Sequence, residues 1–449
     1  MKLQRSTFGT ALACLLLSLS LLGDSAFETD SLKFLNAGYA VSSARRIIFV
    51  PDDFERIQDA INNSTDGDIV LVKPGTYKGG IVINRSIFLM GVNKSTTILD
   101  SETKSDAVTI NENNVVFTGF TIKNGNFPAQ FGVNINNRVN ATVQYNIIVN
   151  NFVGIKLYRA TSNTVKWNQL SNNRYGIFLA HSARNVVFAN NITANEWNGI
   201  ELDWSDQNVI EANTVSSNKA YGFEIPTETP SQDNIVFHNN FFNNTLGIRS
   251  NYINSWSKGY PIGGNFWGVG VGVDEFKGPL QNQPGSDGIT DTPYRVDENN
   301  VDSYPLMNLF NVASPINAKV IFNFTPQKLF AGDVVAFNAS VYTHSSKSAF
   351  SYFWDFGDGT RGHEFNATHV YTSPGSYHVN LYVIDNNEGL LSIEYKSIII
   401  EERLKNVATY VAVGITVTAV VVTFAYIARK QKSKLLLHKQ EPKKEINSY

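Results

Sequence analysis

The chain has 449 residues, of which 43% are hydrophobic, 12% aromatic and 17% charged. This apolar and aromatic content excludes a largely disordered chain, and the low charge excludes a long charged coiled coil. A formal net charge of −2 without a basic domain argues against nucleic-acid binding, and a single cysteine cannot form an intrachain disulfide. The 51 asparagines are unusual, because many of them recur at fixed intervals.

The N-terminal segment predicts export. Lys2 and Arg5 precede an apolar run over residues 8–22, and a small polar exit follows at residues 23–26. We expect residues 1–26 to be a secretory signal peptide, with an uncleaved signal anchor as the alternative. Cys14 lies inside the apolar run, so the mature protein is expected to contain no cysteine.

A short helix is predicted over residues 51–61. Phe54, Ile57 and Ile61 lie on one of its faces, and Asp52 and Glu55 have the spacing of a capping box. We expect this helix to cover the open end of the repeats that follow, because an uncovered strand edge invites aggregation.

The central part of the chain is a repeat. Its first motif is a glycine followed by an apolar, a variable and an apolar residue, and the glycines are spaced by 22, 22, 23 and 23 residues. This motif occurs at Gly132–Ile135, Gly154–Leu157, Gly176–Leu179, Gly199–Leu202 and Gly222–Ile225. Two further motifs carry asparagine, at Asn146, Asn168, Asn190, Asn213 and Asn239, and at Asn150, Asn172, Asn195, Asn218 and Asn243. A unit of this size cannot bury its own apolar side chains, so the units must stack.

This repeat predicts an all-β fold, a parallel β-helix over residues 47–310 with about eight to nine coils. The units contain short strands of alternating apolar residues and no helix-length apolar run. Asparagine suits the corners because it tolerates a left-handed backbone, and its side-chain amides can form hydrogen-bonded ladders between coils. We therefore expect the asparagines to have a structural role.

Several short segments also match a known family. They are Ile57–Ile61, Pro74–Tyr77, Gly119–Ile122, the Gly-Ile-x-Leu coils, Asp291–Tyr294, Asp297–Asn300 and Tyr304–Met307. Through them, residues 48–310 resemble the NosD-type, pectin-lyase-like family of right-handed parallel β-helices. The resemblance implies a right-handed β-helix, but it implies no single activity, because this fold hosts many functions.

One outer face of the predicted β-helix collects charged and aromatic side chains. The register places Glu201 and Glu224 about 5 Å apart on neighbouring coils, with Asp203 about 7 Å away. Close carboxylates raise a pKa or bind a cation, and this spacing overlaps that of glycosidase carboxylates. Glu201, Asp203 and Glu224 are therefore candidate catalytic residues, and the candidate ligand-binding residues are Lys156, Tyr158, Arg159, His181 and Trp204. The alternatives are noncatalytic glycan or cation binding and a solvated face without function.

The family resemblance makes metal binding a function to consider, because NosD relatives are associated with copper handling. Copper prefers Cys, Met and His ligands, whereas the predicted β-helix contains only Met90, Met307, His181 and His238 of these types. We therefore expect no copper site and no other cofactor. Calcium at Asp287 and Asp291, in a short acidic loop, is the one alternative kept open.

A second module is predicted over residues 315–401. Trp354–Thr360 is rich in turn residues, Asp358-Gly359 suits a tight hairpin, and Val379, Leu381 and Val383 alternate along a strand. These segments resemble a PKD (polycystic kidney disease) domain. The resemblance implies a seven-stranded immunoglobulin-like β-sandwich that serves as a spacer or contacts carbohydrates and proteins.

The C-terminal segment predicts membrane anchoring. Residues 407–428 are uncharged and apolar, long enough to cross a bilayer, and Arg429, Lys430, Lys432 and Lys434 follow at once. We expect a single transmembrane helix over 407–428 and a cytoplasmic basic tail over 429–449. Because this tail is basic, the segment between residues 27 and 428 carries a net charge of −8.

Together these features predict a cell-surface protein in the membrane, with its β-helix and PKD domain outside the cell. Its predicted function is noncatalytic binding of an extracellular glycan or of envelope partners. The alternatives are a polysaccharide lyase, hydrolase or epimerase that uses the three carboxylates and, least favoured, copper handling. An exported chain can be glycosylated, and Asn-x-Ser/Thr sequons occur at Asn62, Asn63, Asn84, Asn93, Asn140, Asn191, Asn243, Asn323, Asn338 and Asn366.

Overall fold

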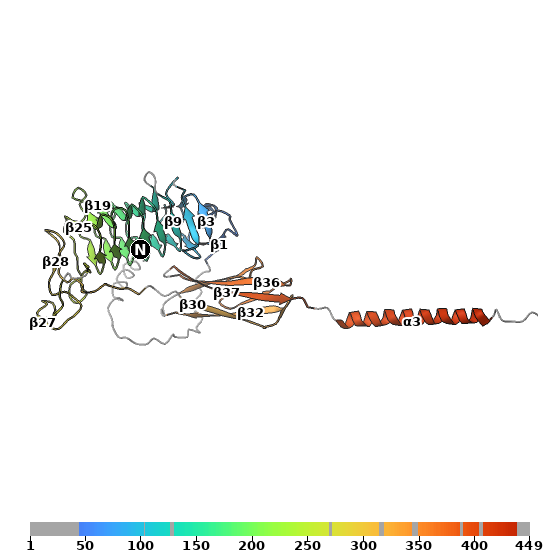
Figure 1. The fold of residues 1–449 in the computed structure, drawn as a ribbon. Helices are drawn as coiled ribbons and strands as arrows, with labels where there is room; N and C mark the ends of the chain where they lie inside the picture. The colour runs from blue at the N-terminus through green and yellow to red at the C-terminus, as the bar shows by residue number, and fades with distance from the viewer. Residues whose placement is uncertain are drawn as a thin grey trace, which may run out of the picture. The chain divides into compact units, whose positions relative to one another are not determined.

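A computed structural model of the protein describes residues 45–437, except 103, 126–129, 269–271, 314–317, 344–348, 387–388 and 404–406. The chain divides into two compact units, one built mainly from residues up to Lys319 and one mainly from Val320 onward (Figure 1). The predicted signal peptide and tail residues 438–449 lie outside the described residues.

The first unit is a β-helix made of three parallel sheets. The first sheet contains β1 (Ile47–Val50), β2 (Ile69–Val72), β5 (Phe88–Gly91), β8 (Val116–Thr118), β11 (Thr142–Gln144), β14 (Thr164–Lys166), β17 (Val186–Phe188), β20 (Val209–Glu211) and β23 (Ile235–Phe237). The second contains β4 (Ile81–Ile83), β7 (Val108–Ile110), β10 (Phe131–Asn136), β13 (Val153–Tyr158), β16 (Tyr175–Ala180), β19 (Ile200–Asp203), β22 (Tyr221–Ile225) and β25 (Gly247–Ser250). The third contains β3 (Gly75–Lys78), β6 (Thr97–Asp100), β9 (Thr121–Lys123), β12 (Ile147–Val149), β15 (Gln169–Ser171), β18 (Asn191–Thr193), β21 (Thr214–Ser216) and β24 (Asn240–Phe242). The predicted coil number is confirmed, because the described strands form sheets of nine, eight and eight. The right-handed winding stays a prediction.

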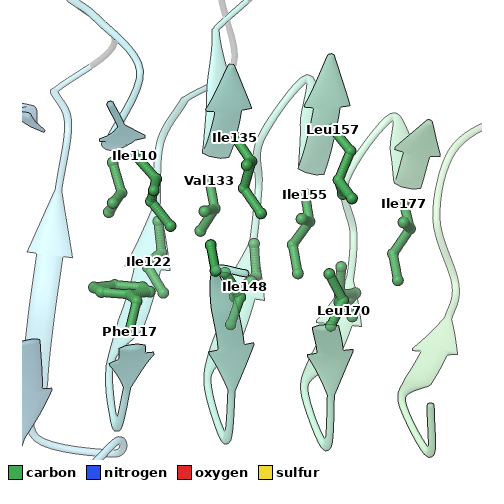
Figure 2. Close-up of a cluster of buried hydrophobic side chains, with 14 of the residues drawn as sticks. Ile110, Phe117, Ile122, Val133, Ile135, Ile148, Ile155, Leu157, Leu170 and Ile177 are labelled. Carbon is green, nitrogen blue, oxygen red and sulfur yellow. The ribbon is translucent and has the colours of Figure 1, made fainter. Parts of the chain in front are cut away.

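The core lies inside the coils, where the three sheets face one another. Figure 2 shows Val133, Ile135 and Ile155 of the second sheet pointing toward Phe117 and Ile148 of the other two. These side chains are fully buried, and full burial of each contributes about 1.5–3 kcal/mol. In-register stacking repeats this packing at every coil and confirms the predicted β-helix.

The glycine of the first motif is required by close packing between coils. A Cβ atom on Gly154 would lie 2.6 Å from the carbonyl oxygen of Gly176 and 2.9 Å from Cδ2 of Leu170. The same approach recurs at Gly132, where the contact is the Gly154 oxygen at 2.6 Å. A side chain there would push neighbouring coils apart.

Three buried ladders of asparagine run along the β-helix. Each side-chain Nδ2 donates to Oδ1 of the asparagine in the next coil, at 2.8 to 3.2 Å, and most also donate to backbone carbonyls. One ladder contains Asn163, Asn185, Asn208, Asn234 and Asn254; the second Asn146, Asn168, Asn190, Asn213, Asn239 and Asn265; the third Asn151, Asn173, Asn195, Asn218 and Asn244. The predicted ladders are thus confirmed, and one of them was absent from the sequence prediction.

The second asparagine motif mixes two structural positions, which the sequence prediction did not separate. Asn195 and Asn218 belong to a ladder, whereas Asn150, Asn172 and Asn243 precede ladder residues and have φ of 57°, 55° and 55°. Other residue types also occupy these left-handed corners, among them Tyr145, Trp167, Ala189, Ala212 and His238. Conformational tolerance therefore explains only some of the asparagines, and the ladders explain more of them.

The predicted N-terminal helix is shorter than expected and lacks its predicted cap. Helix α2 covers only Ile57–Asn62, and its N-cap residue Arg56 makes no side-chain capping bond. Asp52 instead pairs with Lys73, at 2.6 Å, so the capping-box prediction was wrong. Ile57 and Ile61 are buried in the core, which confirms that this helix covers the first coil.

The C-terminal end of the β-helix is closed by residues 251–310, which include β26 (Phe276–Lys277), β27 (Gln283–Pro284), β28 (Tyr294–Arg295) and β29 (Val301–Asp302). Trp256 and Trp267 cover the core, with ring centroids 5.8 Å apart. Asp302 ends the second ladder by accepting from the backbone N–H of Asn265 at 2.7 Å and from Nε1 of Trp267 at 2.8 Å. Burial raises the pKa of Asp302 to about 6.

The second unit contains a two-sheet β-sandwich. One sheet has β30 (Lys319–Thr325), β32 (Val334–Tyr342) and β35 (Ala367–Val370); the other has β31 (Leu329–Phe330), β33 (Phe350–Asp355), β34 (Arg361–Gly362), β36 (Gly375–Asp385) and β37 (Leu390–Glu401). Trp354 is fully buried, and Val379, Leu381 and Val383 face the core as predicted. Tyr382 and Ile384 are buried too, so this part of β36 is covered on both faces.

The C-terminal helix differs from the prediction. Helix α3 runs from Val407 to Leu437 and continues through the basic residues that were expected to follow a membrane span. No helix in the described part of the chain is both long enough and apolar enough to cross a membrane. The predicted transmembrane helix over residues 407–428 is therefore not supported.

Candidate functional site

Glu201 and Glu224 lie side by side in the second sheet, as the repeat register predicts. They are direct partners between β19 and β22, and the side chain of Asn198 donates to both, with 2.6 Å to Oε2 of Glu201. Arg249, their neighbour in β25, donates from Nη2 to Oε1 of Glu224. Glu201 is only 9% exposed and Glu224 only 4%, so these two side chains are not part of a solvated face.

This environment changes the acidity of the carboxylates. Burial raises the pKa of Glu201 to about 7, and the charge of Asp203 adds to the effect, while the Asn198 hydrogen bond and Arg249 oppose it. Burial also raises the pKa of Asp203, against a hydrogen bond that Thr229 Oγ1 donates at 2.9 Å. Asp203 is thus close enough for its charge to act on Glu201, and Glu201 and Glu224 share the Asn198 donor.

A row of aromatic rings lies at the ends of the second-sheet strands. His181 and Trp204 occupy equivalent left-handed corners, with φ of 51° and 50°, after β16 and β19. Their rings are parallel, with centroids 6.3 Å apart, and the ring of Tyr158 meets His181 edge-on at 6.0 Å. Trp204 is 48% exposed. The structure therefore brings three predicted binding residues from three successive coils into one surface row, which we call the corner row (Tyr158, His181 and Trp204).

The two predicted cationic residues join this row at Tyr158. Nζ of Lys156 lies 5.4 Å from the centroid of the Tyr158 ring and 4.2 Å from that of Phe131. The guanidinium carbon of Arg159 lies 5.1 Å from the Tyr158 centroid. Burial lowers the pKa of Lys156, and the charge of Asp106 opposes this shift. All eight predicted catalytic and binding residues thus lie on or beside the second sheet.

The sequence prediction did not include Asn198 or Arg249, although the repeat contained a signal for each. Arg249 occupies the variable position of one more Gly-Ile-x motif that begins at Gly247, where serine replaces the final apolar residue. Asn198 directly precedes a repeat glycine, in the same position as Tyr175 and Tyr221. Residues before the repeat glycine therefore contribute to this face.

The copper-type donors in the described part of the β-helix lie apart from one another. Met90 is fully buried in the β-helix, while His181 and His238 follow strands of different sheets, and His238 Nε2 bonds the carbonyl of Ile262 at 2.7 Å. Across the described ranges, no group of three or more His, Cys, Asp or Glu is placed to hold a metal ion. Donors dispersed in this way do not fit the ligand sets that copper prefers.

The two residues predicted for calcium are engaged with the backbone. Asp287 accepts from the N–H groups of Gly278 and Ile289, both at 3.1 Å, and Asp291 accepts from those of Glu275 and Phe276, both at 3.0 Å. These bonds hold together the loop that contains β26 and β27. Calcium binding at these residues stays a prediction.

Family models match both regions of the chain. Residues 61–271 match the family model described as "Periplasmic copper-binding protein (NosD)", and residues 317–394 match that of the PKD domain. A cell surface glycoprotein of Methanothermus fervidus is 36% identical over 102 residues, which cover 22% of this chain and 16% of that protein. Collagenase ColA of Clostridium perfringens is 43% identical over 53 residues, 12% of this chain and 5% of the collagenase. The chain thus spans only a small part of these relatives.

Solved structures resemble the two regions separately. The periplasmic alginate epimerase AlgG covers 46% of this chain and 54% of its own, at 13% identity and a TM-score of 0.32. The PKD1 domain of the Vibrio cholerae metalloprotease PrtV covers 19% of this chain and 99% of its own, at 28% identity and a TM-score of 0.17. Residues 61–271, which match the NosD family model, thus cover most of the three-sheet β-helix, and residues 317–394, which match the PKD domain model, cover most of the two-sheet β-sandwich.

Proposed function

We propose that this protein binds an extracellular glycan at the corner row without cleaving it. The observation that carries the proposal is the contrast in exposure on one face of the β-helix. Trp204 is 48% exposed, whereas Glu201 and Glu224 are 9% and 4% exposed and already share hydrogen bonds with Asn198. A ligand on this face meets aromatic rings first, and aromatic faces are suited to contact sugar rings.

The spacing of the corner row supports a polymeric ligand. Successive coils are about 4.8 Å apart, so Tyr158, His181 and Trp204 offer one ring per coil along the β-helix. An exported, surface-exposed location fits this function. It is supported by the N-terminal signal pattern and by the partial match to a cell surface glycoprotein. Envelope proteins are the other class of partner that this surface could contact.

One observation favours a second candidate, an enzyme that acts on polysaccharides. A pKa of about 7 would let Glu201 act as a general acid or base near neutral pH, with Asp203 and Glu224 nearby. The enzyme would be a lyase, hydrolase or epimerase. Its substrate would have to displace the hydrogen bonds that now occupy the two glutamates.

Both candidates are tested by incubating the purified protein with a panel of polysaccharides and scoring retention and product formation. Glycan binding predicts retention without products, weakened about three- to tenfold in Trp204→Ala, as expected for loss of an aromatic contact. Trp197→Ala is a matched control, because Trp197 is 46% exposed but precedes β19 instead of following it. Product formation that disappears in Glu201→Gln would contradict the binding proposal and support the enzyme.

A further inference from the structure

We propose that the ligand of the corner row is an acidic glycan, whose carboxylate or sulfate groups bind between Lys156 and Arg159. This inference rests on the proposed function and specifies its ligand class. It starts from the two cations that share the ring of Tyr158, at 5.4 Å and 5.1 Å from its centroid.

Neither cation is neutralised by an ion pair. In the described part of the chain, no carboxylate oxygen lies within 4.0 Å of Lys156 or Arg159, although such pairs form elsewhere on the β-helix, as between Lys73 and Asp52. Two like charges held near one ring repel each other, and an anion bound between them would remove that repulsion. The carboxylate charge that acts on Lys156 is that of Asp106, and this carboxylate already accepts from Phe131 N–H and Asn134 Nδ2, both at 2.9 Å.

The cations are held in place by aromatic packing, which leaves their hydrogen-bond donors available. Lys156 lies against Phe131 and Tyr158, and a lysine ammonium carries three donors. Arg159 is exposed at its corner, where its guanidinium lies against Tyr158. Charge-assisted hydrogen bonds to carboxylate or sulfate oxygens are stronger than neutral ones, so these donors favour an anionic ligand over a neutral sugar.

The remaining charges of this face divide it into two halves. At the coils of β19 and β22, Glu224 is paired with Arg249, and Asp203 accepts from Thr229. Lys156 and Arg159, which form no ion pair within the described residues, thus place positive charge at the β13 coil, next to the first ring of the corner row. An acidic chain would place an anionic group there and lay its sugar rings toward His181 and Trp204.

The test uses three polymers with one backbone: neutral dextran, carboxymethyl-dextran and dextran sulfate. The wild-type protein is expected to retain at least one of the charged forms about tenfold more tightly than neutral dextran, and this preference should weaken as salt rises. Comparison of the two charged forms distinguishes carboxylate from sulfate recognition. The double variant Lys156→Gln/Arg159→Gln should lose the preference.

The matched control is Arg184→Gln/Lys219→Gln, which removes the same charge from exposed residues outside the corner row. It should bind the charged polymers as the wild type does. Equal losses in both double variants, or no retention of either charged polymer, would overturn the inference. Retention of a neutral glycan that needs Trp204 but not the two cations would overturn it as well, while leaving the proposed glycan-binding function intact.

Discussion

At Glu201, the folded protein holds a proton more tightly than the unfolded chain does, because burial raises the carboxyl pKa from 4.5 to about 7. The stabilisation from this proton is complete below pH 4.5 and is lost as the pH rises through 7. The free energy of unfolding should therefore fall by about 3 kcal/mol across this window from Glu201 alone.

Urea unfolding of wild type and Glu201→Gln at pH 5 and pH 8 measures this effect. Glutamine cannot ionise, so the variant should lose the part of the pH dependence that Glu201 contributes. The remainder is expected from Asp302, whose pKa burial raises to about 6, and from Asp203 and Glu211, whose pKa values burial also raises. Identical pH dependence in both proteins would contradict the assignment of the shift to Glu201.

The ladder asparagines make a second prediction at the scale of single residues. Asn190 donates from Nδ2 to Asn213, Val165 and Phe188 and accepts from Asn168. Asn190→Ala would leave several buried groups unpaired, so it should lower the free energy of unfolding by about 3 kcal/mol or more.

Its neighbour provides a control for this experiment. Asn191 is exposed at the start of β18, so Asn191→Ala should change the stability in urea by less than about 0.5 kcal/mol. Equal costs for the two substitutions would show that the ladder contributes nothing beyond an ordinary surface asparagine.

At the scale of the strand, Gly154 sets how closely neighbouring coils approach. A methyl group on Gly154 would lie 2.6 Å from the Gly176 carbonyl oxygen, and that oxygen belongs to the backbone and cannot rotate away. Gly154→Ala should therefore destabilise the β-helix by about 1–3 kcal/mol, as overpacking typically does. A urea midpoint unchanged from wild type would contradict this explanation of the repeat glycine.

The strands and coils could be predicted because each depends on a local pattern that repeats at one period. The alternation Gly-Ile-x-Leu at residues 154–157 is sufficient to place Ile155 and Leu157 inward. The cap of α2 could not be predicted from spacing alone, because Asp52 forms an ion pair with Lys73, which is 21 residues away in the sequence.

The candidate site was predictable in position but not in environment. The register placed Glu201 beside Glu224, and the structure has them as partners. Their hydrogen bonds come from Asn198 and Arg249, which occupy two further positions of the repeat. The acidity and the exposure of a side chain depend on all of its neighbours. The residues at a single position of the repeat are therefore not enough to predict them.

At the scale of the whole molecule, each of the two units has a buried core of its own. Leu170 lies in the β-helix core and Trp354 in the β-sandwich core, and both are fully buried. Leu170→Ala and Trp354→Ala should each cost about 3–5 kcal/mol, in different units. Calorimetry should show two transitions, one lowered by each variant, and a single transition lowered equally by both would contradict separate cores.

The three ladders also divide the β-helix into a fixed part and a variable part. In the coils that begin at Asn163, Asn185, Asn208 and Asn234, successive ladder residues are five apart, as in Asn163, Asn168 and Asn173. In these coils the variation in length falls between the last ladder residue of one coil and the first of the next, a stretch that contains the second-sheet strand. Two sides of the coil thus keep the stack in register, whereas the side that carries the candidate site can lengthen or change its residues without interrupting a ladder. Substitutions on the second-sheet side can therefore change the candidate site while the ladders and the three-sheet fold stay the same.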